Sequence, residues 1–142
     1  MRKLGISSYD VGSVLAISIA QRLVRRVCKE CATQRPLNEK EIAEFNAIAK
    51  RYDVKFNLDG AMTYDTVGCE HCNKTGYYGR IAANEILEIN DTIKDLIVSE
   101  GHISEIRAEA YKTGYRPLVV DAFNKILEGH TTLNEVKNKL AY

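Results

Sequence analysis

The four cysteines of this 142-residue chain are the residues whose type and spacing point most directly to chemistry. They form two pairs, Cys28-Lys-Glu-Cys31 and Cys69-Glu-His-Cys72, which are separated by 37 residues. Two C-x2-C motifs with no cysteine left over are typical of a site in which four thiolates surround one metal ion. Zinc suits such a site because it accepts four sulfur ligands tetrahedrally and imposes no other geometry. We therefore predict a structural Zn2+ held by Cys28, Cys31, Cys69 and Cys72.

Other uses of the cysteines stay open at this point. Disulfides need an oxidising compartment, and the N-terminal sequence lacks the apolar segment of a secretory signal. Iron bound for electron transfer, or inert thiols, are further interpretations of the same pattern. His71 lies inside the second motif and could be a ligand only if a cysteine were displaced, so we expect it outside the ligand set. Four cysteine ligands leave no open position for a substrate, and the predicted role of the metal is structural.

Composition places the chain among ordinary globular domains. Hydrophobic residues make up 45% and charged residues 27% of the sequence, which argues against wholesale disorder. No run of residues approaches the roughly 18 apolar positions that a membrane-spanning helix requires. The formal net charge of +1 gives no overall signature of nucleic-acid binding.

Apolar periodicity predicts the elements that position the two motifs. Residues 10–27 read as an amphipathic helix that runs into Cys28, and Asn38 with Glu41 begins a second helix through Arg51. A strand is predicted from Arg80, followed by four helices over 91–99, 104–114, 117–129 and 133–140. The predicted fold class is α+β and mostly helical, with a tetracysteine zinc-knuckle subdomain followed by a C-terminal helical bundle. The expected division is 1–27 as an N-terminal helical segment, 28–80 as the tetracysteine zinc-binding subdomain, and 81–142 as a strand plus C-terminal helices.

Basic residues gather next to the first cysteine pair. On a helix, Arg22, Arg25, Arg26 and Lys29 would form one basic stripe, since they occur at i, i+3, i+4 and i+7. Arg22 or Arg25 could reach a neighbouring subunit or a nucleotide phosphate. The simpler interpretation is a solvated face that also balances the charge of the thiolates. The sequence leaves both open.

No catalytic constellation is found in the sequence. The G-x-x-x-x-G-K-[ST] phosphate loop, the G-x-S-x-G elbow and the H-E-x-x-H motif are all missing from it. We therefore predict no catalytic residues. One alternative is a zinc-ribbon-like nucleic-acid-binding module, which would use Lys74, Tyr77, Tyr78 and Arg80 as a stacking and phosphate surface. A chaperone-like zinc scaffold is another, although the repeats of its motif are missing.

Several segments together resemble one known family. They are Ala20-Gln-Arg-Leu-Val-Arg-Arg-Val-Cys28, Gly68-Cys-x-x-Cys72, Thr75-Gly-Tyr-x-Gly-Arg80, and the tail around Gly129-His-Thr-Thr132. This joined pattern resembles the C-terminal zinc-binding region of the type II secretion and type IV pilus assembly ATPases, over about residues 4 to 140. One departure is Ala122, where the family usually has glycine.

The resemblance implies a piece of a motor. Family members are cytoplasmic hexamers, peripheral at the inner membrane, that hydrolyse ATP to drive a pilus or a secretion pseudopilus. Their nucleotide-binding motifs lie upstream of the segment that resembles residues 20–28, so ATP and Mg2+ would belong to the parent protein alone. The implied partners are the rest of the ATPase chain, neighbouring subunits of a hexamer and the inner-membrane platform protein, with no nucleic acid. The sequence leaves open whether the machine is a pilus or a secretion system.

Overall fold

The computed structural model describes residues 5–140 and residue 142. Within this part the chain forms six α-helices, one short 3-10 helix and four strands, so the fold is mixed α/β. The chain divides into two compact units. Unit 1 consists of Met1–Ala20 and Glu85–Arg116, and unit 2 consists of Gln21–Asn84 and Pro117–Tyr142.

Two pairs of strands bring the cysteine motifs to their places. The long strands β1 (Ile17–Val27) and β4 (Tyr77–Glu88) pair with each other, and β2 (Ala32–Pro36) pairs antiparallel with β3 (Met62–Thr66). Ala32 lies opposite Thr66 in the second pair, so the chain segments next to Cys31 and Cys69 start from neighbouring positions. The first motif connects β1 to β2, and the second connects β3 to β4.

The predicted helix over residues 10–27 is wrong for most of its length. Only α1 (Ser8–Val14) is helical, and Ile17–Val27 is strand β1. The segment is rich in β-branched side chains, which are stiff in a helix and suited to a strand, and its partner β4 lies far away in the sequence. On a strand, alternate residues share a face, so Arg25 and Arg26 point to opposite faces and no basic stripe forms.

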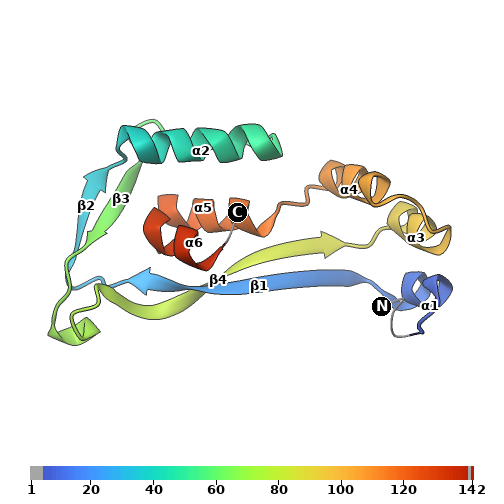
Figure 1. The fold of residues 1–142 in the computed structure, drawn as a ribbon, viewed down its shortest axis with the longest axis horizontal. Helices are drawn as coiled ribbons and strands as arrows, with labels where there is room; N and C mark the ends of the chain where they lie inside the picture. Colours follow the sequence, from blue (N-terminus) through green and yellow to red (C-terminus); the bar gives the residue numbers. More distant parts are fainter. Residues whose placement is uncertain (1–4, 141) are drawn as a thin grey trace. The chain divides into compact units, whose positions relative to one another are not determined.

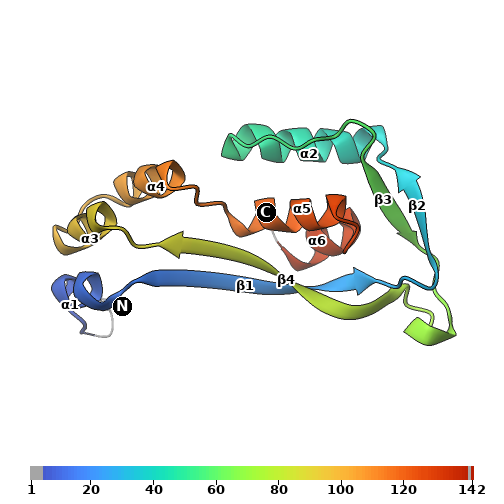
Figure 2. The ribbon, with the colours of Figure 1, turned by 180° about the vertical axis from the view of Figure 1, so that it is seen from behind.

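Unit 2 has a well-filled core between α2 (Glu39–Tyr52), α5 (Leu118–Leu127) and α6 (Leu133–Lys139). The predicted capping box at the start of α2 is confirmed, since Asn38 Oδ1 accepts from Glu41 N and the Asn38 N–H donates to the Glu41 carboxylate. In Figure 1, α2 runs alongside α5, and Figure 2 shows β2 and β3 side by side next to the start of α2. The rings of Phe45 and Phe123 meet edge to face in the core, with centroids 4.8 Å apart.

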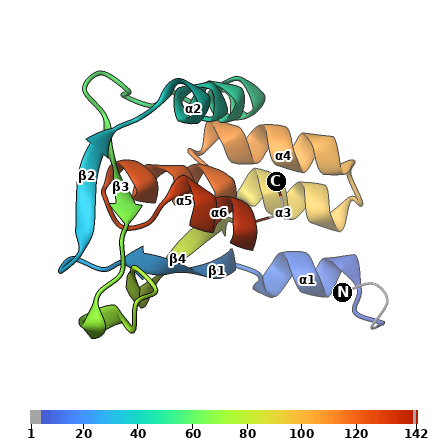
Figure 3. The same cartoon turned by 60° about the vertical axis from the view of Figure 1, so that its left-hand side comes forward.

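Unit 1 contains α1, α3 (Asp91–Val98) and α4 (Ile103–Lys112), which lie next to one another in Figure 3. Helices α1 and α3 approach each other closely at Gly12 of α1, where an added Cβ would stand 2.6 Å from Cγ2 of Val98 on α3. The Ser8 hydroxyl donates to Glu100 Oε1 at 2.9 Å. The buried core of this unit is small and consists of Ile89, Ile93 and Ala110.

The predicted C-terminal helical bundle does not form as one body. Helices α3 and α4 belong to unit 1, whereas α5 and α6 belong to unit 2. The prediction of a mostly helical fold is also wrong, because the long strands β1 and β4 occupy segments that include the expected first helix. Each helix was predicted from the apolar stripe in its own sequence. Such a stripe indicates that one face is buried, but it does not identify the element that packs against this face. Among the described residues, no helix is long and apolar enough to cross a membrane.

Candidate metal centre

The four cysteine sulfurs come together at one point of unit 2. All four Sγ atoms lie within 4.8 Å of one another. The Sγ–Sγ distances are 3.8 Å for Cys28–Cys69, 3.8 Å for Cys31–Cys72 and 3.7 Å for Cys69–Cys72. Each C-x2-C motif therefore contributes two sulfurs to the same cluster, as the spacing in the sequence predicts.

These distances fit four thiolates around one ion. Zinc–sulfur bonds of about 2.3 Å in a tetrahedral site place any two sulfurs about 3.8 Å apart. A disulfide would require sulfurs only about 2.05 Å apart, and all four cysteines are free thiols in this structure. The disulfide interpretation is therefore wrong for this arrangement, and the cluster has the geometry that could hold a metal ion.

The first motif is a tight turn tied to the second one. The Ala32 N–H donates to the Cys28 carbonyl at 2.9 Å and closes the turn. The Cys28 N–H donates to the carbonyl of Gly76 at 2.9 Å, which connects the end of β1 to the second motif. These bonds position the buried Cys28 sulfur at the cluster.

The second motif depends on backbone conformations that few residues adopt. The 3-10 helix Glu70–Cys72 is followed by Asn73 and Lys74, both in the left-handed region with φ of 51° and 59°. Gly76 follows with φ of 75°, and a Cβ at this position would lie 2.5 Å from Cβ of Thr66. Glycine is required there because both the backbone angle and the close approach exclude a side chain.

Backbone donors set the charge state of one sulfur. The N–H groups of Cys69 and Gly76 donate to Cys72 Sγ at 3.1 and 3.2 Å. Burial alone would raise the pKa of Cys72, but these backbone hydrogen bonds outweigh it and lower the pKa to about 6. By contrast, burial raises the pKa of Cys28 and raises that of Cys31 to about 12. A metal ion at this site must therefore displace protons from thiols as it binds.

The histidines stay outside the cluster. His71 is exposed, and its ring stacks on that of Tyr78 with centroids 4.2 Å apart. His102 caps α4, where its Nδ1 accepts from Ser104 N. His130 lies 3.6 Å from the carboxylate of Glu128. His71 is thus not one of the residues that form the cluster.

Arg25 is held inside unit 2, and this interaction was missed from the sequence. Its Nε and a terminal nitrogen lie 2.9 and 2.6 Å from Glu135 Oε2, and its backbone N–H donates to Oε1 at 3.0 Å. Its guanidinium also lies over the ring of Tyr77, 4.1 Å from the centroid. Tyr77 in turn shares a 2.8 Å hydrogen bond with Thr132. Arg25 thus joins β1, β4 and the start of α6, so its side chain already has partners within the chain.

Burial and pairing oppose each other at Glu135. Its side chain is completely buried, and burial alone would raise the pKa of the carboxyl. Hydrogen bonds from the side chain and backbone of Arg25 outweigh burial and lower the pKa below its usual value. In the sequence, the Thr132–Glu135 spacing is typical of a capping box at the start of the helix predicted over 133–140. The Glu135 N–H does donate to Thr132 Oγ1, but the carboxylate turns to Arg25 instead.

The surface considered for nucleic-acid stacking is partly occupied by intramolecular contacts. Lys74 pairs with Glu70 at 2.8 Å, and the ring of Tyr77 is covered by Arg25. Tyr78 and Arg80 remain exposed. Tyr78 also contacts the ring of His71, so three of the four side chains have partners within the chain.

The fold and the site define a mixed α/β chain organised around a four-cysteine centre that could hold a metal ion. Comparison with known proteins gives the family. Residues 1–138 match the family described as "Type II/IV secretion system protein", and the chain belongs to it.

Individual relatives agree with this assignment. The chain is 33% identical over 136 residues to the "Type IV pilus assembly ATPase TfpB" of Acinetobacter baylyi, which covers 96% of this chain and 22% of the relative. It is 34% identical over 140 residues to the "Type IV pilus assembly ATPase PilB" of Myxococcus xanthus, covering 97% and 24%. It is also 34% identical over 138 residues to "Type II secretion system protein E" of Aeromonas hydrophila, covering 96% and 25%. The chain thus spans about a quarter or less of the length of these curated relatives.

Proposed function

We propose that Cys28, Cys31, Cys69 and Cys72 bind one structural Zn2+, and that the chain is the zinc-binding fragment of a hexameric ATPase that powers type IV pilus assembly or type II secretion. The observation that carries the proposal is the spacing of the four sulfurs, at 3.7 to 3.8 Å in the three pairs given above. The family assignment supports the motor as the parent. The place of this fragment at the carboxyl end of the parent remains a prediction from the sequence.

The chain's own residues account for what such a centre would do. The motifs join the end of β1 to β2 and the end of β3 to β4, so four thiolates fixed at one point hold four strand ends together. Bound there, zinc would supply a tetrahedral cross-link and no open coordination position. The Cys28–Gly76 bond and the glycine at 76 already hold the two turns in register. The result is a rigid body, suited to transmitting movement rather than to catalysis.

The fragment itself has a structural and coupling role in this proposal. ATP and Mg2+ would bind to parts of the parent outside this chain, since the relatives that carry "ATPase" in their names are about four times as long or longer. The proposed arrangement keeps 1–27 with the ATPase core, 28–80 as the zinc-binding subdomain and 81–142 as the closing segment. The proposed location is cytoplasmic, at the inner membrane through the assembled machine.

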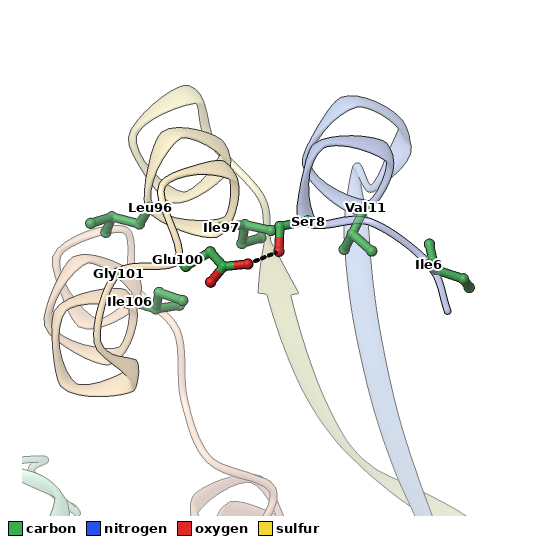
Figure 4. Close-up of a pocket in the computed structure, with 8 residues that line it drawn as sticks. All are labelled: Ile6, Ser8, Val11, Leu96, Ile97, Glu100, Gly101 and Ile106. Atoms are coloured by element: carbon green, nitrogen blue, oxygen red, sulfur yellow. Dashed lines mark hydrogen bonds between the residues drawn. The ribbon is translucent and has the colours of Figure 1, made fainter. Parts of the chain in front are cut away.

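The rest of the ATPase chain is the first partner we propose. The apolar surface of unit 1 supports this proposal. An apolar groove of about 230 Å³ in this unit is lined mainly by Ile6, Val11, Leu96, Ile97 and Ile106. Figure 4 shows these side chains along the groove, with the Ser8–Glu100 hydrogen bond beside them. Tyr9, Val14 and Ile103 are also exposed in the same unit. Neighbouring subunits and the inner-membrane platform protein are the further partners in this proposal.

A full-length relative tests the proposal. The substitution equivalent to Cys69→Ser, made in a full-length type IV pilus assembly ATPase, should remove bound zinc, lower the thermal stability and abolish pilus assembly. Purified hexamers should keep part of their ATPase rate, because the nucleotide site lies elsewhere. Zinc content, unfolding temperature, ATPase rate and pilus number are measured on the same variant. Unchanged stability and unchanged assembly would contradict a structural and coupling role.

A further inference from the structure

A cleft of about 250 Å³ lies directly beside the cysteine cluster in unit 2. Its lining comes from both motifs and the strands beside them. Arg26 and Val27 belong to the end of β1, Lys29 and Glu30 to the first motif, His71 to the second motif and Tyr78 to the start of β4. Lys29 and Glu30 lie between two of the cysteines, and His71 lies between the other two. The walls of the cleft are therefore fixed relative to each other whenever the four sulfurs are held together.

In the described part of the chain, the cations of this cleft are not paired with carboxylates, unlike several other cations of the same unit. Arg25 pairs with Glu135, Arg35 with Glu41 and Lys125 with Asp121. Arg26 and Lys29 make no ion pair with any residue that the structure describes. Two cationic groups without a carboxylate partner, at the edge of one cleft, favour binding of an anionic group.

The remaining lining favours a peptide over a phosphate. Tyr78 is 59% exposed, and its ring contacts that of His71 at an interplanar angle of 41°. Exposed tyrosine rings are enriched at protein interfaces. Glu30 also lines the cleft, and its carboxylate accepts hydrogen bonds, which the N–H groups of a peptide can donate and a phosphomonoester dianion cannot. Cations, an acceptor and an apolar ring together match a segment that carries carboxylates, backbone donors and apolar side chains.

We infer that this cleft binds a short acidic segment of a partner protein, with glutamate or aspartate side chains on Arg26 and Lys29 and an apolar side chain on Tyr78. This inference goes beyond the proposed function. It requires that the cysteine centre is closed, but it does not depend on which machine the chain serves.

The test uses the metal-loaded chain and a short fluorescein-labelled peptide that alternates glutamate and leucine. Binding is followed by fluorescence polarisation, and a glutamine-for-glutamate peptide serves as the probe control. The double variant Arg26→Gln/Lys29→Gln should weaken binding by about tenfold or more, because it removes both cations. The matched variant Lys40→Gln/Lys50→Gln changes the net charge equally on α2 and should stay within about twofold. Amide chemical shifts of the unmodified chain should move around Lys29, His71 and Tyr78.

Several outcomes would overturn the inference. Equal losses in the two double variants would mean that the peptide follows net charge and not the cleft. Competition by inorganic phosphate or by phosphatidylglycerol vesicles at the strength of the peptide would mean a general anion site. Shifts confined to other parts of the chain would place the peptide elsewhere. Metal content and circular dichroism are measured on each variant, so a failure of the metal centre is distinguished from a failure of the cleft.

Discussion

In the part of the chain that the structure describes, unit 2 buries twelve hydrophobic residues in one core, whereas unit 1 buries three in its own. Exposed large apolar side chains show the opposite distribution, with nine in unit 1 and three in unit 2. Unit 2 also contains the cysteine cluster, which can add a cross-link to a filled core. Unit 2 can therefore be stabilised by its own core and cross-link, whereas unit 1 has an apolar surface suited to burial against other protein.

The largest expected effect comes from breaking the cluster in unit 2. Cys69→Ser should remove the bound metal and destabilise this unit, so that its cooperative unfolding transition is no longer observed. Structural zinc contributes on the order of 10–16 kcal/mol in zinc-finger peptides, which is comparable to the whole stability of a domain. Zinc content and thermal unfolding by circular dichroism check the prediction. His71→Ala is the matched control and should keep one zinc, since its ring lies outside the cluster.

The next effect concerns the ion pair between the half-exposed Arg25 of β1 and the buried Glu135 of α6. Glu135→Gln keeps the volume of the side chain but removes the charge that faces Arg25, and it should cost about 2 kcal/mol of unfolding free energy. Denaturant unfolding measures this loss. Glu70→Gln removes a pair with Lys74 that is exposed on both sides, and it should change the free energy by less than about 0.5 kcal/mol. Equal effects of the two variants would show that the Arg25 pair adds nothing to unit 2.

The same pair gives a pH dependence with a defined sign. The folded-state pKa of Glu135 is lowered, so its contribution is present above the unfolded pKa of about 4.3 and is lost as the pH falls through the folded value. Unmodified protein should therefore lose stability on acidification more steeply than Glu135→Gln. Metal content is followed in parallel, because thiols that regain protons also release a metal ion. Parallel pH profiles at equal metal content would contradict the assignment.

An effect of similar size, confined to unit 1, is expected where α1 and α3 approach each other closely. Gly12→Ala places a Cβ 2.6 Å from Cγ2 of Val98, so α1 and α3 must move apart, at a cost of about 1–3 kcal/mol. Hydrogen exchange of α1 and α3 amides should speed up, while amides of unit 2 should keep their protection. Ser13→Ala, at the neighbouring exposed position, is the control. Faster exchange in unit 2 alone would contradict this local account.

The smallest effect in this chain should come from the exposed apolar side chains of unit 1. Val14→Ser and Ile103→Ser should change the unfolding free energy by less than about 0.5 kcal/mol. The reason is that Val14 is already 80% exposed and Ile103 is already 64% exposed. In a full-length relative the equivalent changes should each cost about 1.5–3 kcal/mol if the rest of the ATPase covers them. Thermal unfolding of both proteins makes the comparison. If the substitutions had equally small effects in this chain and in the full-length relative, this surface would not be an interface with the rest of the ATPase.

The sequence predicted the cysteine pairs well, because the geometry of each pair depends on residues that are only three positions apart. A C-x2-C turn aims two sulfurs at one point, and the capping box of Asn38 and Glu41 likewise depends on residues three apart. Strand β1 was mistaken for a helix because its apolar residues fit both periods over a short window. Its pairing with β4 joins residues far apart in the sequence, which no local pattern reports.

The role of Glu135 was missed for a similar reason. Its position three residues after Thr132 matches a capping box, and the backbone half of that box is present. The carboxylate turns to Arg25, 110 residues away in the sequence, because the start of α6 lies next to β1 in unit 2. Charge partners at such separation depend on the packing of the whole unit. The division of the helices between two units could not be predicted from their stripes for the same reason.

Native mass spectrometry of the chain, before and after treatment with a strong chelator, tests the central claim most directly. The chain is purified without added metal, and its folding is followed by circular dichroism in the same samples. We predict one zinc ion per chain before treatment, and loss of both the ion and the structure of unit 2 afterwards. A chain that is free of metal and equally folded with or without the chelator would contradict the claim that the four cysteines form a structural zinc centre.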